Sequence, residues 1–99
     1  MRKIILNKLG DAEQMELTEV EIPSASADQV LVKHAAIGIN FIDIYQRSGL
    51  YPLNLPSGLG LEASGVVESV GELVKNFKVG DRVCYCNGPV GAYAEFNLV

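Results

Sequence analysis

The sequence predicts a small, mainly β fold, either a barrel or a sandwich, with one short helix. Six or seven short segments carry strand patterns, and turn signals recur about every ten residues between them. A length of 99 residues fits one domain with a thin core. No repeat or linker divides the chain, so residues 1–99 are expected to form one unit.

The first third of the chain is expected to form strands. Residues 4–6 are a short apolar run before a turn at Gly10 and Asp11. Between Met15 and Ile22 the apolar alternation changes phase, which predicts a β-bulge near Thr18 and Glu19. After a loop of small residues, segment 29–39 is rich in Val, Ile, Leu and Ala and predicts the clearest strand.

Residues 41–47 predict the single helix, because their apolar side chains recur at helical spacing. Asn40 is placed to cap the N-terminus, and Asp43 falls where the partner residue of a capping box sits. Gly49 is expected to end the helix after two turns or fewer.

The second half returns to strands. Residues 50–60 contain two prolines and two glycines and cannot hold a regular element for long. Strands are expected over 63–70, from a turn at Gly80 through Tyr85, and over 92–99. The apolar pattern continues to the last residue, so the chain is expected to be cut from a longer one.

Composition argues against several classes of partner. The net charge is only −4, and the acidic excess is concentrated between Lys8 and Lys33, which predicts a solvated outer face and no nucleic-acid ligand. No apolar run approaches the roughly 18 residues of a membrane span. The basic start turns polar at Asn7, unlike a signal peptide, so a cytoplasmic location is expected.

The thiols and the single histidine receive plain structural interpretations. Cys84 and Cys86 are the only cysteines and are poorly placed to pair with each other, so they are interpreted as two strand thiols in a reducing compartment. His34 is expected to be a hydrogen-bonded strand residue. Arg47 could reach a phosphate but is expected to be solvated.

Four stretches together resemble one known group of enzymes. They are residues 36–52 (AIGINFIDIYQRSGLYP), 56–71 (PSGLGLEASGVVESVG), 79–83 (VGDRV) and 91–95 (GAYAE). The chain is similar to the zeta-crystallin-like quinone oxidoreductases of the medium-chain dehydrogenase/reductase superfamily. This resemblance implies a GroES-like, partly open β-barrel with one or two short helices, which forms the N-terminal portion of the catalytic domain. It also implies that NADP(H) is held mainly by a Rossmann domain absent from these 99 residues.

Two positions distinguish the subgroup. In the zinc-dependent alcohol dehydrogenases of the superfamily, a Cys follows the Gly-Ile pair and a His precedes the Glu of the glycine-rich stretch. Asn40 and Leu61 occupy these positions here. An amide is a poor zinc ligand and leucine is none, so no zinc is expected.

The resemblance also implies the site residues. It places Asn40, Tyr45 and Tyr51 as catalytic hydrogen-bond donors, with Asn40 and Tyr45 also facing the cofactor, and Asp43 and Glu62 behind them as support. Taken alone, these residues have other interpretations: a helix cap for Asn40, ordinary half-buried aromatics for the tyrosines, and a surface ion pair for Glu62. The glycines between residues 58 and 65 do not form a dinucleotide-binding fingerprint.

The function expected from this resemblance is NADPH-dependent reduction of quinones or similar small electrophiles without zinc. Hydrogen-bond donors aimed at the developing oxyanion would replace the metal. Two alternatives stay open: a zinc-free enoyl or enone reductase, and a non-enzymatic GroES-like binding module. The complete enzyme is expected to be a homodimer with no nucleic-acid or membrane partner, and the 99 residues alone are expected to be inactive.

Overall fold

A computed structural model describes all residues from 1 to 99 and shows a mainly β fold. In chain order the elements are β1 (Arg2–Leu6), the 3-10 turn η1 (Ala12–Gln14), β2 (Met15–Glu19), β3 (Val30–Ile37), α1 (Phe41–Ser48), β4 (Ala63–Val70), β5 (Arg82–Tyr85) and β6 (Phe96–Leu98). The predicted class, with one short α-helix, is confirmed. No helix is long and apolar enough to cross a membrane.

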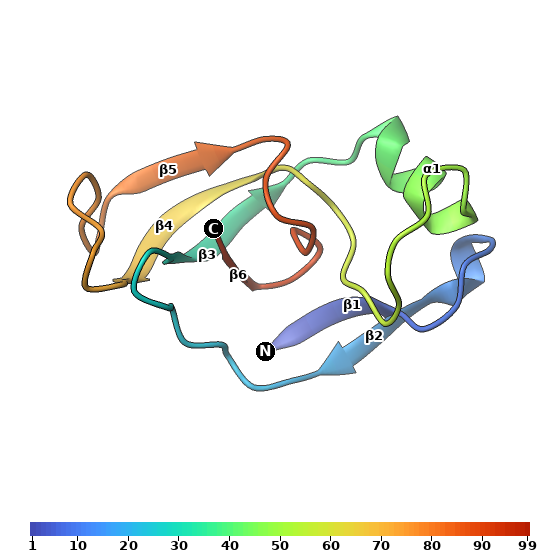
Figure 1. The fold of residues 1–99 in the computed structure, drawn as a ribbon, viewed down its shortest axis with the longest axis horizontal. Helices are drawn as coiled ribbons and strands as arrows, with labels where there is room; N and C mark the ends of the chain where they lie inside the picture. Colours follow the sequence, from blue (N-terminus) through green and yellow to red (C-terminus); the bar gives the residue numbers. More distant parts are fainter.

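The strands form two sheets that do not close on each other. β1 pairs with β2, and the larger sheet has the order β5-β4-β3-β6, with every pair antiparallel. Figure 1 shows the β1–β2 pair below the larger sheet and α1 beyond the end of β3. Isolated bridges from Lys3 to Ala94 and from Leu6 to Ser57 join the two layers. This arrangement is the partly open barrel that the resemblance implies.

The core is thin, as the chain length predicts. Only 13 of the 99 residues are buried, and the largest fully buried apolar side chains are Leu6, Leu59 and Val67. They come from β1, from the loop before β4 and from β4 itself. The long loop between α1 and β4 therefore contributes to the core without regular structure.

The predicted bulge near Thr18 and Glu19 is wrong. β2 pairs with β1 in an unbroken register from Leu6↔Met15 to Arg2↔Glu19, and the strand ends at Glu19. The change of apolar phase thus marks the point where the chain leaves the sheet. The irregularities lie instead in the pairing of β3 with β4, between Leu31 and Val32 and between His34 and Ala36.

The last strand is shorter than predicted. β6 covers only Phe96–Leu98, because a tight turn in which the Ala94 N–H donates to the Ala92 carbonyl at 2.7 Å interrupts the extended pattern before it. The turn brings the chain against β1, where the Ile4 N–H donates to the Tyr93 carbonyl at 2.8 Å. The alternating pattern does not reveal this turn, because none of Ala92, Tyr93 and Ala94 is a turn-forming glycine or proline.

The helix agrees with its prediction. Asn40 is the extended N-cap and Gly49, at φ 97°, is the left-handed C-cap. Arg47 differs from the expectation of a solvated side chain, because its Nε donates to the Gly10 carbonyl at 3.3 Å while the Gly10 N–H donates to the Arg47 carbonyl at 2.9 Å. These bonds join the end of α1 to the turn after β1.

Candidate functional site

The N-terminus of α1 holds an oriented amide. Asn40 and Asp43 have the arrangement of a capping box, in which the Asn40 N–H donates to Asp43 Oδ2 at 3.0 Å. The side-chain Nδ2 of Asn40 donates to Glu62 Oε2 at 2.8 Å. Glu62 thus fixes one N–H of the amide, and the second remains available as a donor.

Glu62 reaches Asn40 because Gly38 has no side chain. A Cβ on Gly38 would lie 2.0 Å from Glu62 Oε2 and 2.6 Å from its carboxyl carbon. The backbone joins the same two residues, since the Gly38 N–H donates to the Glu62 carbonyl at 3.0 Å. Gly38 therefore provides the space in which the Glu62 carboxylate lies.

Asp43 is the only charged residue in the buried set, with 2% of its surface exposed. Besides the Asn40 N–H, its Oδ2 accepts a hydrogen bond from the Tyr93 hydroxyl at 2.6 Å, whereas its Oδ1 is buried without a partner. Burial and the neighbouring Asp43 carboxylate raise the pKa of Tyr93 well above its ordinary range, and the charge of Arg47 acts in the opposite direction. Asp43 therefore links the start of α1 to the segment before β6.

Tyr45 and Tyr51 pack edge to face at the outer side of α1. Their ring centroids are 5.8 Å apart with an interplanar angle of 83°. The Tyr51 N–H donates to the Tyr45 carbonyl at 3.1 Å, which holds the chain after Gly49 against the helix. Both side chains are exposed, so the structure brings the two predicted phenols together on one surface.

Exposed apolar side chains flank the amide on both sides. Ile39 is 80% exposed and Phe41 is 76% exposed, and Leu50 beyond the helix is also exposed. A cluster of exposed apolar residues around a few polar groups is typical of a binding surface.

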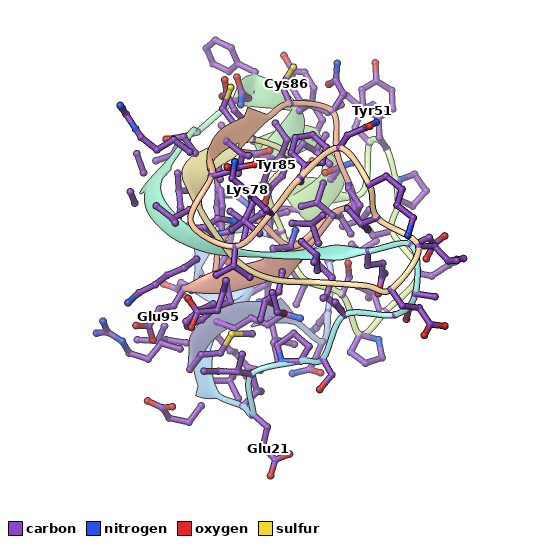
Figure 2. The ribbon with its side chains drawn as sticks, turned by 90° about the vertical axis from the view of Figure 1, so that its left-hand side faces the viewer. Glu21, Tyr51, Lys78, Tyr85, Cys86 and Glu95 are labelled. Atoms are coloured by element: carbon purple, nitrogen blue, oxygen red, sulfur yellow. The ribbon has the colours of Figure 1, made fainter.

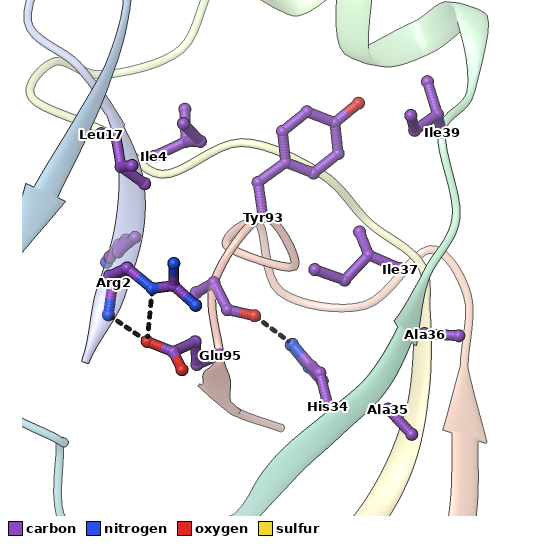
Figure 3. Close-up of a pocket in the computed structure, with 12 residues that line it drawn as sticks. Arg2, Ile4, Leu17, His34, Ala35, Ala36, Ile37, Ile39, Tyr93 and Glu95 are labelled. Atoms are coloured by element: carbon purple, nitrogen blue, oxygen red, sulfur yellow. Dashed lines mark hydrogen bonds and ion pairs between the residues drawn. The ribbon is translucent and has the colours of Figure 1, made fainter.

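Tyr93 was not among the residues that the sequence identified as functional. Figure 3 shows it in an apolar groove of about 470 Å³, between Leu17 and Ile4 on one side and Ile37 and Ile39 on the other. An ion pair between Arg2 and Glu95 lies at one end of this groove. A tyrosine in a run of small residues needs a partner for its hydroxyl, but nothing in the sequence indicates that this partner is Asp43.

His34 is hydrogen-bonded at both ring nitrogens, as predicted. Nδ1 lies 2.7 Å from the Ala94 carbonyl, which can only accept, and Nε2 lies 2.9 Å from the Tyr85 hydroxyl. The Tyr85 hydroxyl also accepts from Asn97 Nδ2 at 3.1 Å, and burial raises the pKa of Tyr85. This network joins β3, β5 and β6 and leaves His34 no free nitrogen for catalysis.

The residues around Asn40 do not fit a zinc ion, which other members of the superfamily carry. The Asn40 amide points an N–H at Glu62, and Leu61 offers no donor atom. No three His, Cys, Asp or Glu side chains lie close enough together to hold a metal.

A dinucleotide would find only part of its site in these residues. Every strand pair is antiparallel, so no strand-helix-strand unit presents a helix N-terminus to a pyrophosphate. The glycine-rich stretch leads into β4 and not into a helix. The described residues therefore contain no Rossmann-type unit for the phosphates of a dinucleotide.

Cys84 and Cys86 are free and exposed. Cys84 lies in β5, and Cys86 follows the last residue of that strand. The expectation that both thiols lie in a strand therefore holds for Cys84 and is wrong for Cys86.

Comparison with known proteins identifies the family. The model of the alcohol dehydrogenase GroES-like domain matches residues 26–99. The chain is 48% identical over 99 residues to a quinone oxidoreductase of Pseudomonas aeruginosa and 47% identical over 98 residues to quinone oxidoreductase 1 of Escherichia coli K12. These alignments cover 99% and 98% of this chain but only 30% of each relative.

Solved structures agree with this match. The crystal structure of the Escherichia coli quinone oxidoreductase complexed with NADPH superposes with a TM-score of 0.97 at 44% identity, over 100% of this chain and 31% of that chain. A 2-haloacrylate reductase superposes with a TM-score of 0.88 at 38% identity, over 100% of this chain and 29% of that chain. The chain thus spans about a third of the proteins that it resembles. It belongs to the family of alcohol dehydrogenase GroES-like domains and is similar to about a third of the length of several quinone oxidoreductases.

Proposed function

We propose that the chain is the substrate-facing part of an NADPH-dependent reductase that reduces small quinones without zinc. The observation that carries the proposal is the Asn40 amide, which Glu62 holds at the start of a helix that also carries Tyr45 of the Tyr45–Tyr51 ring pair. Its two neighbours in the chain, Ile39 and Phe41, are exposed apolar residues. The similarity to quinone oxidoreductases, one of them solved with NADPH, supports the same reaction. NADPH, held by a further domain, would supply the hydride.

The chain's own residues would bind the quinone and stabilise its charge. Ile39 and Phe41 would contact the ring, and the free N–H of Asn40 would donate to a quinone oxygen as negative charge develops on it. Tyr45 or Tyr51 would donate to the same oxygen or to the second one. Because reduction produces an aromatic hydroquinone with delocalised charge, such donors can replace a Lewis acid.

Asp43 and Glu62 would support this site without touching the substrate. Glu62 orients the Asn40 side chain, and Asp43 holds the Asn40 backbone N–H and the Tyr93 hydroxyl. The same arrangement could polarise the carbonyl of an enone. The similarity to a 2-haloacrylate reductase from Burkholderia, 41% identical over 98 residues, favours this as the second candidate.

Steady-state kinetics of the intact protein with NADPH and a panel of quinones and enones test the proposal. We expect kcat/KM to be highest for quinones, and a preference for enones would select the second candidate. If neither quinones nor enones are turned over, the remaining alternative is a non-enzymatic binding module. The 99 residues alone should show no turnover and at best weak NADPH affinity by calorimetry.

Tyr45→Phe separates the phenol's donor role from its packing. Removal of one oxyanion donor costs about a hundredfold or more in turnover in other enzymes, and the easier reduction of a quinone should make the loss here about five- to fiftyfold in kcat/KM. Asn40→Ala should lower kcat/KM as well and also removes part of the helix cap. Wild-type kinetics of Tyr45→Phe on several quinones would remove Tyr45 from the mechanism.

We also propose that the intact protein is a homodimer and that it is located in the cytoplasm. Light scattering of the intact protein and fractionation of cells that express it test these two points.

A further inference from the structure

A second cavity lies on the larger sheet, next to the support of the Asn40 site. It has a volume of about 500 Å³ and runs across the ends of β3, β4 and β5. Cys84, Cys86 and Tyr85 line one side of it, and Gly38 and Glu62 line the other. Both thiols are exposed.

The strand register places one thiol nearer to Glu62 than the other. In the β4–β5 pair, Ser64 lies opposite Cys84 and Ala63 lies opposite Tyr85. The pairing ends at Ala63 and Tyr85, and Glu62 and Cys86 are the next residues beyond that end. The Glu62 carboxylate binds the Asn40 amide. Figure 2 shows Cys86 and Tyr51 toward the same end of the molecule, opposite Glu21. Cys86 is thus the thiol on the side of the Asn40 site.

We propose that this cavity is a covalent modification site for quinones, with Cys86 as the nucleophile. The choice of electrophile rests on the proposed function, because an enzyme that takes quinones as substrates is exposed to them. The cavity is large enough for a one-ring quinone, and both thiols line it. Exposed thiols react with such soft electrophiles through the thiolate.

The step is a balanced addition. The Cys86 sulfur forms a bond to a ring carbon of the carbon–carbon double bond that is conjugated with a carbonyl. The S–H bond and the π bond break, and the thiol proton ends on the oxygen of that carbonyl. The hydrogen on the attacked ring carbon then moves as a proton to the second oxygen, which restores the aromatic ring. The product is a hydroquinone attached through a thioether, and neither NADPH nor another oxidant or reductant takes part.

Intact-mass and peptide mass spectrometry of the whole protein test the site. The protein is treated without NADPH and without oxygen with an excess of 1,4-benzoquinone at several concentrations and short reaction times. Iodoacetamide, a small alkylating reagent that needs no binding site, is used in parallel. We expect one quinone per chain, on Cys86 in preference to Cys84, at a rate that saturates with quinone concentration. Iodoacetamide should label both thiols with no such preference.

Two variants provide matched controls. Cys86→Ser should lower the rate of quinone addition about tenfold, because a bound ring next to a nucleophile reacts faster than a colliding one, and Cys84→Ser should leave most of it. The proposal is overturned if both thiols react with benzoquinone in the same ratio as with iodoacetamide, if the rate is linear in quinone concentration, or if Cys84 is preferred.

The result is separate from the test of the proposed function. Addition requires no NADPH, so turnover without selective labelling refutes the Cys86 site alone. Selective labelling without NADPH-dependent turnover refutes the proposed reductase alone.

Discussion

The hydrogen bond from Tyr93 to Asp43 should contribute a large share of the stability of this small domain. Tyr93→Phe removes only the hydroxyl, which donates to Asp43 Oδ2 at 2.6 Å. The ring should stay in place, because it packs directly on Gly60, where a Cβ would lie 2.4 Å from Tyr93 Cδ1. The variant therefore isolates one hydrogen bond to a buried carboxylate.

The structure sets the magnitude. Hydrogen bonds to charged groups contribute about 1.5–3 kcal/mol. Asp43 is 2% exposed and its Oδ1 already lacks a partner, so after the substitution the Asn40 N–H is the carboxylate's remaining hydrogen bond. We expect a loss of about 2 kcal/mol in the free energy of unfolding, which corresponds to a fall in Tm of about 8–16 °C for a domain of this size.

Urea unfolding and differential scanning calorimetry measure the effect. Tyr51→Phe is the matched control, because its side chain is exposed and the change should stay within about 0.5 kcal/mol. In a double-mutant cycle with Asp43→Asn, the two changes should couple. A loss below about 0.5 kcal/mol for Tyr93→Phe, with no coupling to Asp43, would refute the reasoning.

Four further outcomes are expected. The pKa of Tyr93 is raised in the folded state, so its contribution to stability is fully present below the unfolded value of about 10 and is lost as the pH rises above that value. The free energy of unfolding, measured by circular dichroism at alkaline pH, should therefore depend less on pH in Tyr93→Phe than in the wild type. Gly65→Ala should abolish folding, because its Cβ would lie 1.9 Å from a backbone oxygen. Gly80→Ala has open space around its Cβ but a φ of 93°, so it should lower the free energy of unfolding in urea by only about 1–2 kcal/mol. Gly38→Ala should displace the Glu62 side chain and lower kcat/KM of the intact enzyme with little change in Tm. Elemental analysis of protein purified without chelator should find no stoichiometric zinc, and one zinc per chain would overturn the assignment to the zinc-free group.

Local elements were predictable because local patterns specify them. The helix follows from Asn40, Asp43 and Gly49, whose roles as cap, capping partner and terminator depend on a few neighbouring residues. The strand over residues 63–70 has the bounds predicted from its β-branched composition. The bulge was placed wrongly, because the same change in apolar phase occurs wherever a chain leaves a sheet.

The sequence by itself determined the mainly β class, the helix at the candidate site and, through Asn40 and Leu61, a donor set that does not suit zinc. Only the tertiary structure decided which groups meet. Tyr93 reaches Asp43 across 50 residues and Asn40 reaches Glu62 across 22. Such contacts depend on the register of β4 on β3 and on the space above Gly38, which several distant segments set together. The periodicity of a single segment does not predict these hydrogen bonds, because a hydrogen bond between distant residues depends on the fold that brings them together.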